Sequence, residues 1–497
     1  MTIKLYNFLT RKKENLKPLK KGVVGLYTCG PTVYSFAHIG NFRAYIFEDI
    51  LKRSLKYSGL KVKHVMNITD VEDKIIKNAS VSGKTIFEFT KPYEVAFYND
   101  LKKLNIEPAW KYPKATDHIK EMISVIKALI KNKLAYKADG SVYFDVSKFK
   151  KYGKLSRLRK SDFPGKSDFH RTDSDEYDKS SAQDFVLWKA KKGGEPSWPS
   201  PFGEGRPGWH IECSAMSMKY LGKSFDIHAG GIDLLFPHHE NEIAQSEGAT
   251  KKRFVKYFIE GEHLLVDGKK MSKSLGNVFT LRDLENKNFD PLAFRYLLLG
   301  ARYRTQLNFT LESLKAAQIS LGRLQEFVLS LKLKSAGERF SEMTKAQILR
   351  GLAQSRHGGT SRAILQQENM RAGAKSGAKA LESASDNFQI AVSNDLDTPK
   401  ALAQVWGVVN EYNKNGKKYD AGEVLGLLLE FDRVLGLGLA DVREPEKPSD
   451  EISQFLKERE EARKVRDFTS ADLLRQKIYD LGWEIQDTPD GPRLKKI

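Results

Sequence analysis

The feature that most constrains the fold is an alternation of strands and helices near the start of the chain. Residues 23–27 form a short apolar run that leads into a turn at 28–31, which predicts a strand followed by a loop. Residues 41–57 carry apolar side chains at mostly three- and four-residue spacing, which predicts a helix. Residues 62–66 and 71–79 predict a second strand and a second helix. This order favours a parallel sheet with right-handed crossovers, whose ligands bind at the carboxyl ends of the strands.

An insertion interrupts the predicted sheet. A helix at 118–134 and a strand at 141–146 precede a charged, weakly hydrophobic stretch that runs to about residue 179. Residues 224–229 and 254–259 then predict the returning strands of the same sheet. The helices of this second half are predicted at 209–220 and 238–246.

Past the sheet, residues 264–270 predict a hairpin with an Asp-Gly turn. Residues 351–385 hold few large apolar side chains and are predicted to be mobile or a weak helix. A linker with prolines at 445 and 448 precedes the last segment of the chain. Beyond Asp290, apolar spacing predicts helices at 291–300, 311–331, 386–392, 399–413, 422–435, 451–464 and 470–481.

The composition indicates a cytoplasmic protein of several domains. Hydrophobic residues make up 40% of the 497, enough for folded cores, and no apolar run approaches the ~18 residues of a membrane span. The chain has two cysteines, Cys29 and Cys213, too few for a disulfide framework, and its first residues lack the pattern of a secretory signal. A net charge of +20 suits either a nucleic-acid partner or a solvated basic surface, and charge alone leaves both open.

Two short motifs could carry chemistry. His38-Ile39-Gly40-Asn41 opens the first helix, where a glycine allows close approach of a ligand and the helix N-terminus attracts phosphate. Lys270-Met271-Ser272-Lys273-Ser274 follows the predicted hairpin, and its two lysines could grip a polyphosphate as point charges. Taken singly, the first motif is better explained by a packed or solvated histidine, and the second is equally well explained by a lysine-rich surface turn.

Together, the two motifs resemble the HIGH element and the KMSKS loop of class I aminoacyl-tRNA synthetases. Four further blocks resemble those of the cysteinyl-tRNA synthetase family, and the resemblance extends from residue 3 to residue 497 apart from 351–385. These blocks are Leu26-Tyr27-Thr28-Cys29-Gly30-Pro31-Thr32-Val33-Tyr34, Asn67-Ile68-Thr69-Asp70, Gly208-Trp209-His210-Ile211-Glu212-Cys213-Ser214-Ala215-Met216 and Phe236-Pro237-His238-His239-Glu240-Asn241-Glu242.

The resemblance implies an α/β fold: a Rossmann-like parallel-sheet catalytic domain split by an insertion, then an α-helical bundle and a small C-terminal anticodon-binding domain. The implied boundaries are 1–114 and 206–262 for the halves of the catalytic domain and 115–205 for the connective insertion. Those of the later parts are 263–305 for the KMSKS loop and stem-contact region, 306–440 for the bundle and 450–497 for the anticodon-binding domain.

The implied function is activation of L-cysteine with ATP and Mg²⁺, then transfer of cysteine to tRNA(Cys), by a protein expected to be a monomer. One Zn²⁺ per chain would be held by Cys29, Cys213, His238 and Glu242 and would recognise the substrate thiol. From the residues alone, buried structural thiols are the favoured explanation of the two cysteines. Because His238 and Glu242 lie four residues apart, a helix would project both from one face.

The remaining site residues are also implied by the resemblance. The cysteine pocket would be lined by Gly30, Thr69, Trp209 and Asp233, and ATP would be bound by His38, Gly40, Asn41, Lys270 and Lys273. The anticodon would be read by Arg463, Asp472 and Asp487, although Arg463 also suits a solvated helix face. Asn41 departs from the class pattern, which has His at this position; Asn keeps an N–H donor but cannot be cationic.

Two other functions fit parts of the sequence. A related ligase joins cysteine to an amino sugar with the same front half, but it lacks an anticodon domain, and residues 451–497 argue against it. A non-enzymatic RNA-binding protein would keep the basic charge, but it would have no reason to keep both the predicted zinc ligands and the KMSKS loop.

Overall fold

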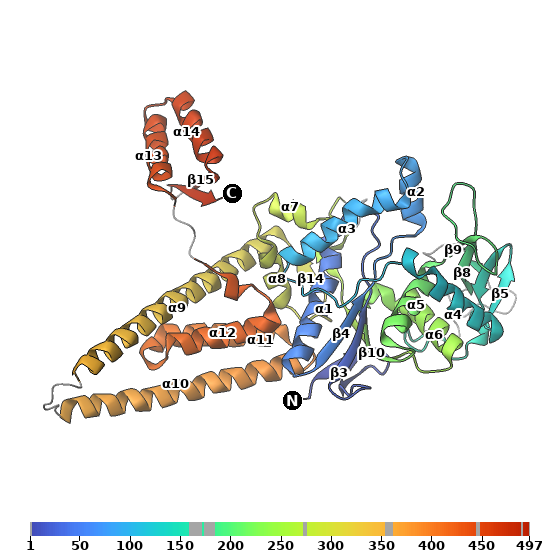
Figure 1. Ribbon diagram of the computed structural model, residues 1–497, viewed down its shortest axis with the longest axis horizontal. Coiled ribbons are helices and arrows are strands. Elements are labelled where there is room, and N and C mark those ends of the chain that lie inside the picture. The colour runs from blue at the N-terminus through green and yellow to red at the C-terminus, as the bar shows by residue number, and fades with distance from the viewer. Residues whose placement is uncertain are drawn as a thin grey trace. The chain divides into compact units, whose positions relative to one another are not determined.

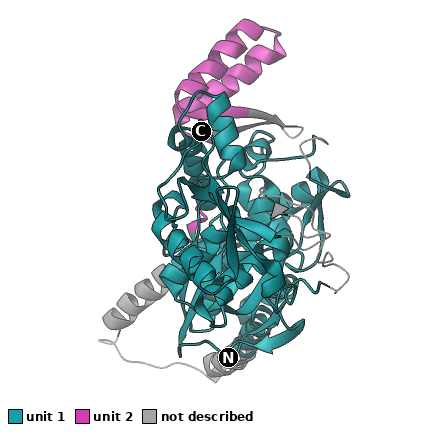
Figure 2. Cartoon of the chain, turned by 90° about the vertical axis from the view of Figure 1, so that its right-hand side faces the viewer, with its two compact units in different colours: residues 1–440 teal, residues 441–497 magenta. Residues whose placement is uncertain are grey.

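The computed structural model describes residues 2–158, 171–172, 184–271, 276–352, 361–443, 448–488 and 491–496 (Figure 1). The chain divides into two compact units, residues 1–440 and 441–497 (Figure 2). The described residues include no helix that is both long and apolar enough to cross a membrane.

The core of the first unit is a four-stranded sheet in the order β11-β10-β3-β4, with all three strand pairs parallel. Its strands are β3 (Val23–Thr28), β4 (Lys61–Met66), β10 (Phe225–Gly231) and β11 (Val255–Gly261). The parallel sheet and its returning strands are therefore confirmed. Helix α1 (Ile39–Tyr57) joins β3 to β4 and contacts β4 and β10.

Two later helices carry side chains to the same sheet. Helix α5 (Trp209–Leu221) contacts β3 and β4, and it packs against α6 (Glu240–Thr250). Cys29 and Cys213 belong to one apolar cluster together with Tyr27, Val65 and Phe258. Both thiols therefore lie in the core beneath the ends of the strands, and His238 lies just before α6, in the turn Leu235–His239.

The insertion forms its own small sheet, in the order β5-β6-β8-β7 with β9 paired to β8. Helix α4 (Ile119–Lys131) confirms the predicted helix, and β6 (Ser141–Phe144) confirms the predicted strand. Much of the charged stretch before residue 179 lies outside the described residues. The remaining strands are β5 (Ala135–Ala138), β7 (Arg171–Thr172), β8 (Asp184–Ala190) and β9 (Gly205–Pro207).

The predicted hairpin is confirmed as β12 (Leu264–Val266) paired antiparallel with β13 (Lys269–Lys270). Asp267 and Gly268 have φ of +50° and +74°, as a tight turn of this kind requires. The turn places Lys270 at the start of the predicted phosphate loop. Of that loop, residues 272–275, and with them Lys273, lie outside the described residues.

The helical part of the first unit exceeds the predicted bounds. Helix α9 (Leu311–Leu352) runs well beyond the predicted end at residue 331, and α10 (Ser361–Ser393) occupies most of the stretch predicted to be mobile or weakly helical. Both regions are rich in Ala, Lys, Gln and Glu, whose intrinsic preference extends a helix without a long apolar face. The other helices are α2 (Asp73–Val81), α3 (Ile86–Lys103), α7 (Leu281–Glu285), α8 (Pro291–Leu299), α11 (Thr398–Asn415) and α12 (Ala421–Leu435).

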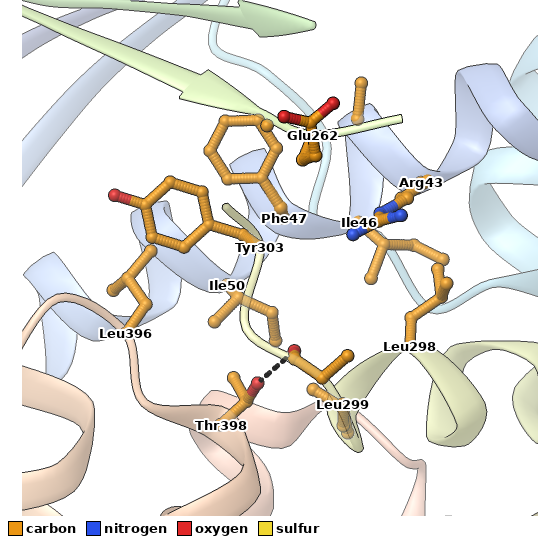
Figure 3. Close-up of a pocket in the computed structure, with 13 residues that line it drawn as sticks. Arg43, Ile46, Phe47, Ile50, Glu262, Leu298, Leu299, Tyr303, Leu396 and Thr398 are labelled. Carbon is orange, nitrogen blue, oxygen red and sulfur yellow. Dashed lines mark hydrogen bonds between the residues drawn. The ribbon is translucent and has the colours of Figure 1, made fainter. Parts of the chain in front are cut away.

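The sheet and the helical part meet through an apolar joint (Figure 3). Phe47 of α1 stacks on Tyr303, with ring centroids 5.1 Å apart. Leu298 of α8 and Leu396 line the same small cavity of about 30 Å³. The Thr398 hydroxyl donates to the carbonyl of Ala301 at 3.2 Å and closes one side of the joint.

A buried ion pair crosses the same joint. Arg295 of α8 donates to the Asp49 carboxylate at 2.6 Å and to the carbonyls of Leu104 and Leu435, so it ties α1 and α8 to the end of α12. Both charged side chains are fully buried. Burial favours the neutral acid, but Arg295 and Arg53 hold the pKa of Asp49 below its usual range.

We expect Arg295→Met to lower the free energy of unfolding by about 3 kcal/mol, because it leaves a buried carboxylate and two carbonyls short of a donor. Lys191→Met is the matched control, since Lys191 pairs with Glu204 while both side chains are about half exposed, and such a pair contributes ~1 kcal/mol or less. Urea unfolding measures both. Equal losses in the two variants would contradict this account of the joint.

The second unit has a separate small core. Helices α13 (Asp450–Lys464) and α14 (Phe468–Asp480) pack together beside a hairpin of β15 (Trp483–Thr488) and β16 (Gly491–Lys496). Ile452, Ile478, Trp483 and Ile485 form its apolar centre. The two predicted charged helices are thus confirmed.

Candidate active site and metal centre

A cavity of about 720 Å³ opens where the sheet strands β3 and β10 end. Residues of both predicted motifs line it, together with the turn after β3 and the start of α5. The predicted site residues in its lining are Cys29, Gly30, His38, Gly40, Asn41, Trp209, Asp233 and Lys270. Thr69 is not among the described residues that line the cavity; it is 1% exposed, and its hydroxyl donates to Glu212 at 3.0 Å.

The first motif is built as a helix start. The Asn41 side-chain oxygen accepts from the His38 N–H at 3.1 Å, and His38 Nδ1 accepts from the Asn41 N–H at 3.2 Å. This reciprocal capping fixes the His38 ring at the N-terminus of α1, where the helix dipole favours anions. Asn41 therefore acts in this structure through its oxygen as an acceptor.

The second motif lies directly against the first. The Ile39 N–H donates to the Phe279 carbonyl at 2.8 Å, which holds the chain after the loop to the start of α1. A Cβ added at Gly40 would lie 2.2 Å from the Met271 methyl carbon. A side chain at position 40 would therefore push the flexible end of Met271 away from this helix N-terminus, where the glycine lets it pack.

The four predicted metal ligands converge at the other part of the site. Their donor atoms all lie within 4.8 Å of one another and all four side chains are buried. The Cys29 and Cys213 sulfurs are 4.0 Å apart, and His238 Nε2 lies 3.1 Å from Glu242 Oε1. The ligands come from the end of β3, from α5, and from the turn and helix at 235–250.

These separations fit a tetrahedral zinc site. Bonds of about 2.3 Å to sulfur place two thiolates about 3.8 Å apart, and bonds of about 2.0 Å place nitrogen and oxygen about 3.3 Å apart. Two thiolates, an imidazole and a carboxylate also suit zinc chemically.

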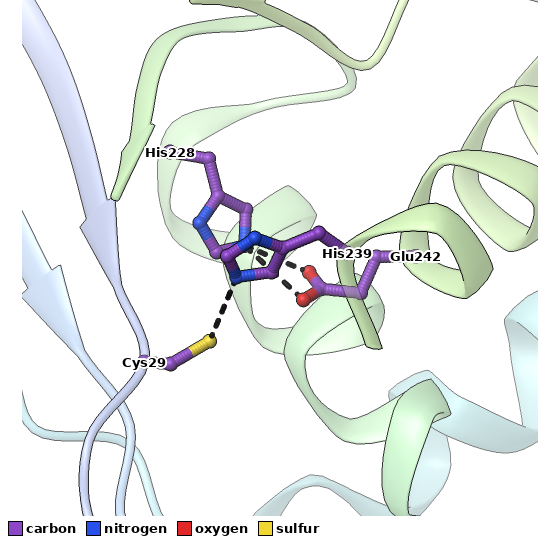
Figure 4. Close-up of side chains that lie close together, drawn as sticks. All are labelled: Cys29, His228, His239 and Glu242. Carbon is purple, nitrogen blue, oxygen red and sulfur yellow. Dashed lines mark hydrogen bonds and ion pairs between the residues drawn. The ribbon is translucent and has the colours of Figure 1, made fainter. Parts of the chain in front are cut away.

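A second group of donors overlaps the first. Cys29, His228, His239 and Glu242 also bring their donor atoms within 4.8 Å of one another (Figure 4). His228 Nε2 lies 3.0 Å from Glu242, and His239 Nδ1 lies 2.9 Å from Glu260. This group offers one thiol where the first offers two, so zinc favours the first, and His228 and His239 are placed to support its ligands from behind.

Sequence reasoning missed His210, His228, His239 and Glu260 as parts of this centre. His210 Nδ1 lies 2.9 Å from His238 Nδ1, so it contacts a predicted ligand directly. His210 and His239 stand inside the motif blocks that carried the resemblance, which was the available signal. His228 and Glu260 lie within β10 and β11, and nothing in those apolar runs distinguishes them from buried polar side chains of other kinds.

The pKa values of the four predicted ligands show which of them are already ionised in the absence of a metal and which still carry a proton. Burial opposes ionisation of Cys213, but the hydrogen bond with Cys29 and the neighbouring His238 lower the pKa of its thiol to about 6. Burial also opposes the His238 cation, yet Cys213 and Glu242 raise its pKa to about 10. Burial alone would raise the pKa of Glu242, but His228 and His238 hold it well below its usual range. Burial raises the pKa of the Cys29 thiol, so a metal must displace a proton from Cys29 and another from His238 on binding.

The predicted anticodon residues lie in the second unit. Arg463 is exposed in the last turn of α13, and Asp472 is exposed on α14. Asp487 belongs to strand β15, and only its backbone is described. Their role stays a prediction.

The parallel sheet, with a histidine-bearing helix start packed against a lysine-bearing loop over one cavity, defines a class I aminoacyl-tRNA synthetase. Residues 15–319 match the family model of the catalytic domain of class I (C) tRNA synthetases. Solved structures with the same fold include methionyl-tRNA synthetase of Mycobacterium tuberculosis with methionyl-adenylate, at a TM-score of 0.56 and 13% identity, covering 84% of this chain and 93% of that one. A leucyl-tRNA synthetase complex from Agrobacterium radiobacter has a TM-score of 0.57 at 13% identity, covering 86% and 85%.

Full-length relatives identify the family within that class. The cysteine–tRNA ligase of Protochlamydia amoebophila is 44% identical over 99% of this chain and 98% of its own length. That of Brachyspira hyodysenteriae is 44% identical over 99% of both chains, and that of Chlamydia felis is 45% identical over 99% and 98%. The chain belongs to the cysteine–tRNA ligase family.

Proposed function

We propose that this protein activates L-cysteine with ATP to form cysteinyl-adenylate and pyrophosphate, then transfers cysteine to the 3′-terminal adenosine of tRNA(Cys). The proposal depends on one observation: the metal centre and the two nucleotide motifs share a single cavity. Cys29 of the thiol–histidine–carboxylate centre lines this cavity, and so do His38 of the first motif and Lys270 of the second. Amino acid and ATP would therefore meet inside it. Expectations of a monomer and of a cytoplasmic location stay predictions.

Selection of cysteine is the harder task, because serine differs only by oxygen for sulfur and a pocket of fixed shape separates near-isosteres poorly. A zinc ion held by Cys29, Cys213, His238 and Glu242 would take the substrate sulfur as a fifth ligand, in its thiolate form, whereas the serine hydroxyl is a weak ligand. Trp209 lies beside this centre, with its ring centroid 4.4 Å from that of His238, and would form a wall of the amino-acid pocket. Asp233 lines the same cavity and would receive the substrate ammonium.

Activation needs positioning and charge compensation and no protein nucleophile. The cysteine carboxylate attacks the α-phosphate and pyrophosphate leaves, so negative charge moves onto the leaving group. The N-terminus of α1, with the His38 ring fixed there by capping, would bind ATP phosphate, and Lys270 and Lys273 would stabilise the departing pyrophosphate with Mg²⁺.

We expect Lys273→Ala to lower the rate of adenylate formation by ~10²-fold while cysteine binding stays nearly unchanged. A charge recruited in the transition state affects turnover more than ground-state affinity. Single-turnover adenylation and equilibrium cysteine binding measure the two effects separately. Lys269→Ala, one residue before the motif and exposed, is the control and should retain its rate. A large loss of cysteine affinity with an unchanged rate would show that the assignment is wrong.

The proposal is tested by measuring two reactions with the purified protein: cysteine-dependent ATP–pyrophosphate exchange, and attachment of labelled cysteine to tRNA(Cys). Both are expected. A protein that catalyses the exchange but charges no tRNA(Cys) would refute the second half of the proposal, and one that catalyses neither would refute it entirely.

A further inference from the structure

A buried chain of hydrogen bonds runs behind the metal centre. The Gly30 N–H donates to Asn67 Oδ1 at 3.0 Å, Asn67 Nδ2 donates to Thr69 Oγ1 at 3.2 Å, and Thr69 Oγ1 donates to Glu212 Oε2 at 3.0 Å. Asn67, Thr69 and Glu212 are each 1% exposed. We call these four residues the Gly30–Glu212 relay.

Chemistry fixes the direction of each bond in the relay. A backbone N–H only donates, so the Asn67 atom that faces Gly30 is its oxygen, and its amide nitrogen must face Thr69. That nitrogen also only donates, so the Thr69 proton is left for the Glu212 carboxylate. Three successive buried hydrogen bonds of this kind hold the two ends of the chain at a set distance.

The ends of the relay are the chain neighbours of the two thiols. Gly30 directly follows Cys29, and Glu212 directly precedes Cys213. The turn at Gly30 also has no room to move toward Asn67, because an added Cβ would lie 1.8 Å from the Asn67 carbonyl oxygen. Contact with the Asn67 carbonyl oxygen therefore prevents the turn at Gly30 from moving toward Asn67, and the hydrogen bond to Asn67 Oδ1 restrains it from moving away.

We propose that the Gly30–Glu212 relay sets the separation of the two thiols and thereby the metal affinity of the centre. Asn67, Thr69 and Glu212 act in this role as positioning residues for Cys29 and Cys213, whose sulfurs lie 4.0 Å apart. Partners that orient metal ligands from behind typically change affinity by 10- to 100-fold when lost. The inference rests on the proposed function, because it concerns the same zinc ion.

The test compares zinc affinity, by competition with a chromophoric chelator, and the absorption spectrum of the Co²⁺-substituted protein. We expect Thr69→Val and Glu212→Leu, neither of which can continue the relay, to weaken zinc binding by ~10–100-fold and to reduce or shift the sulfur-to-cobalt charge-transfer bands. Thr69→Ser keeps the hydroxyl and should restore both. Thr90→Val is the matched control, since the Thr90 hydroxyl is likewise buried but donates to the Ile86 carbonyl within α3.

The outcomes separate the inference from the proposed function. A wild-type protein that binds neither Zn²⁺ nor Co²⁺ would refute the metal site itself. A wild-type protein that binds both, with unchanged affinity and spectra in Thr69→Val and Glu212→Leu, would overturn the relay. If Glu212→Leu does not fold, the nearly isosteric Thr69→Val decides alone, and a loss equal to that of Thr90→Val would also count against the relay.

Discussion

Replacing Cys213 with serine is expected to remove zinc and cysteine selection together. The Cys213→Ser protein should hold far less than one zinc ion per chain, and its kcat/KM for cysteine should fall by ~10³-fold or more. Loss of a group that only supports a ligand costs ~10–100-fold, so loss of a ligand should cost more. The structure gives the reason: Cys213 is the thiol whose pKa is lowered to about 6, and its sulfur lies 4.0 Å from that of Cys29. Metal analysis and steady-state kinetics measure the two effects.

Ser217→Ala is the matched control on the same helix, because Ser217 is also fully buried but its hydroxyl donates to the Ser214 carbonyl. It should keep both zinc and activity. A Cys213→Ser protein with a full complement of zinc, or with unchanged affinity for cysteine, would rule out the assignment of this thiol.

Ending the chain at Lys447 is expected to separate the two steps of the reaction. This truncation removes α13, α14 and the hairpin β15–β16, while the first unit keeps its own sheet and cavity. Cysteine-dependent pyrophosphate exchange should be largely unchanged. Charging of tRNA(Cys) should fall by ~10²-fold or more, because contacts to bases contribute ~1–3 kcal/mol each and the lost segment carries Arg463, Asp472 and Asp487.

Salt provides a second readout for the truncated protein. Its remaining contacts to tRNA should be mainly to phosphates, so added salt should weaken binding steeply. Equal exchange activity in the full and truncated proteins serves as the control for folding. If the truncated protein charges tRNA(Cys) as efficiently as the full chain, residues 450–497 do not read the anticodon.

The elements of the fold that depend on short-range sequence patterns, such as apolar runs and turn residues, were predictable. The strands β3, β4, β10 and β11 are apolar runs bounded by turns, and the hairpin after them is marked by Asp267-Gly268, whose positive φ angles explain why those residues stand there. Helix α3 was missed, although the three-residue spacing of Thr85 and Glu88 is typical of a capping box, which the two residues form at the start of this helix. The lengths of α9 and α10 were underestimated because the prediction extended a helix only where apolar residues recur at helical spacing. In these two helices, residues with a high intrinsic helix preference continue the helix without that spacing.

The site was predictable only through resemblance. Cys29 and Cys213 are far apart in sequence, and only tertiary structure brings their sulfurs to 4.0 Å. His228 and Glu260 were missed because a polar side chain inside an apolar strand gives no sign of what it will face across the fold. The relay from Gly30 to Glu212 joins the ends of two strands to a helix, so no single segment of sequence contains it.

The central claim is that this protein is selective for cysteine through a thiol-binding metal ion. Its most direct test is the ratio of kcat/KM for cysteine to that for serine in ATP–pyrophosphate exchange, measured before and after zinc is stripped with a chelator and again after zinc is restored. The account predicts a ratio of ~10³ or more in the zinc protein, loss of cysteine activation in the stripped protein, and recovery on adding zinc. A stripped protein that still activates cysteine with the same preference over serine would contradict it.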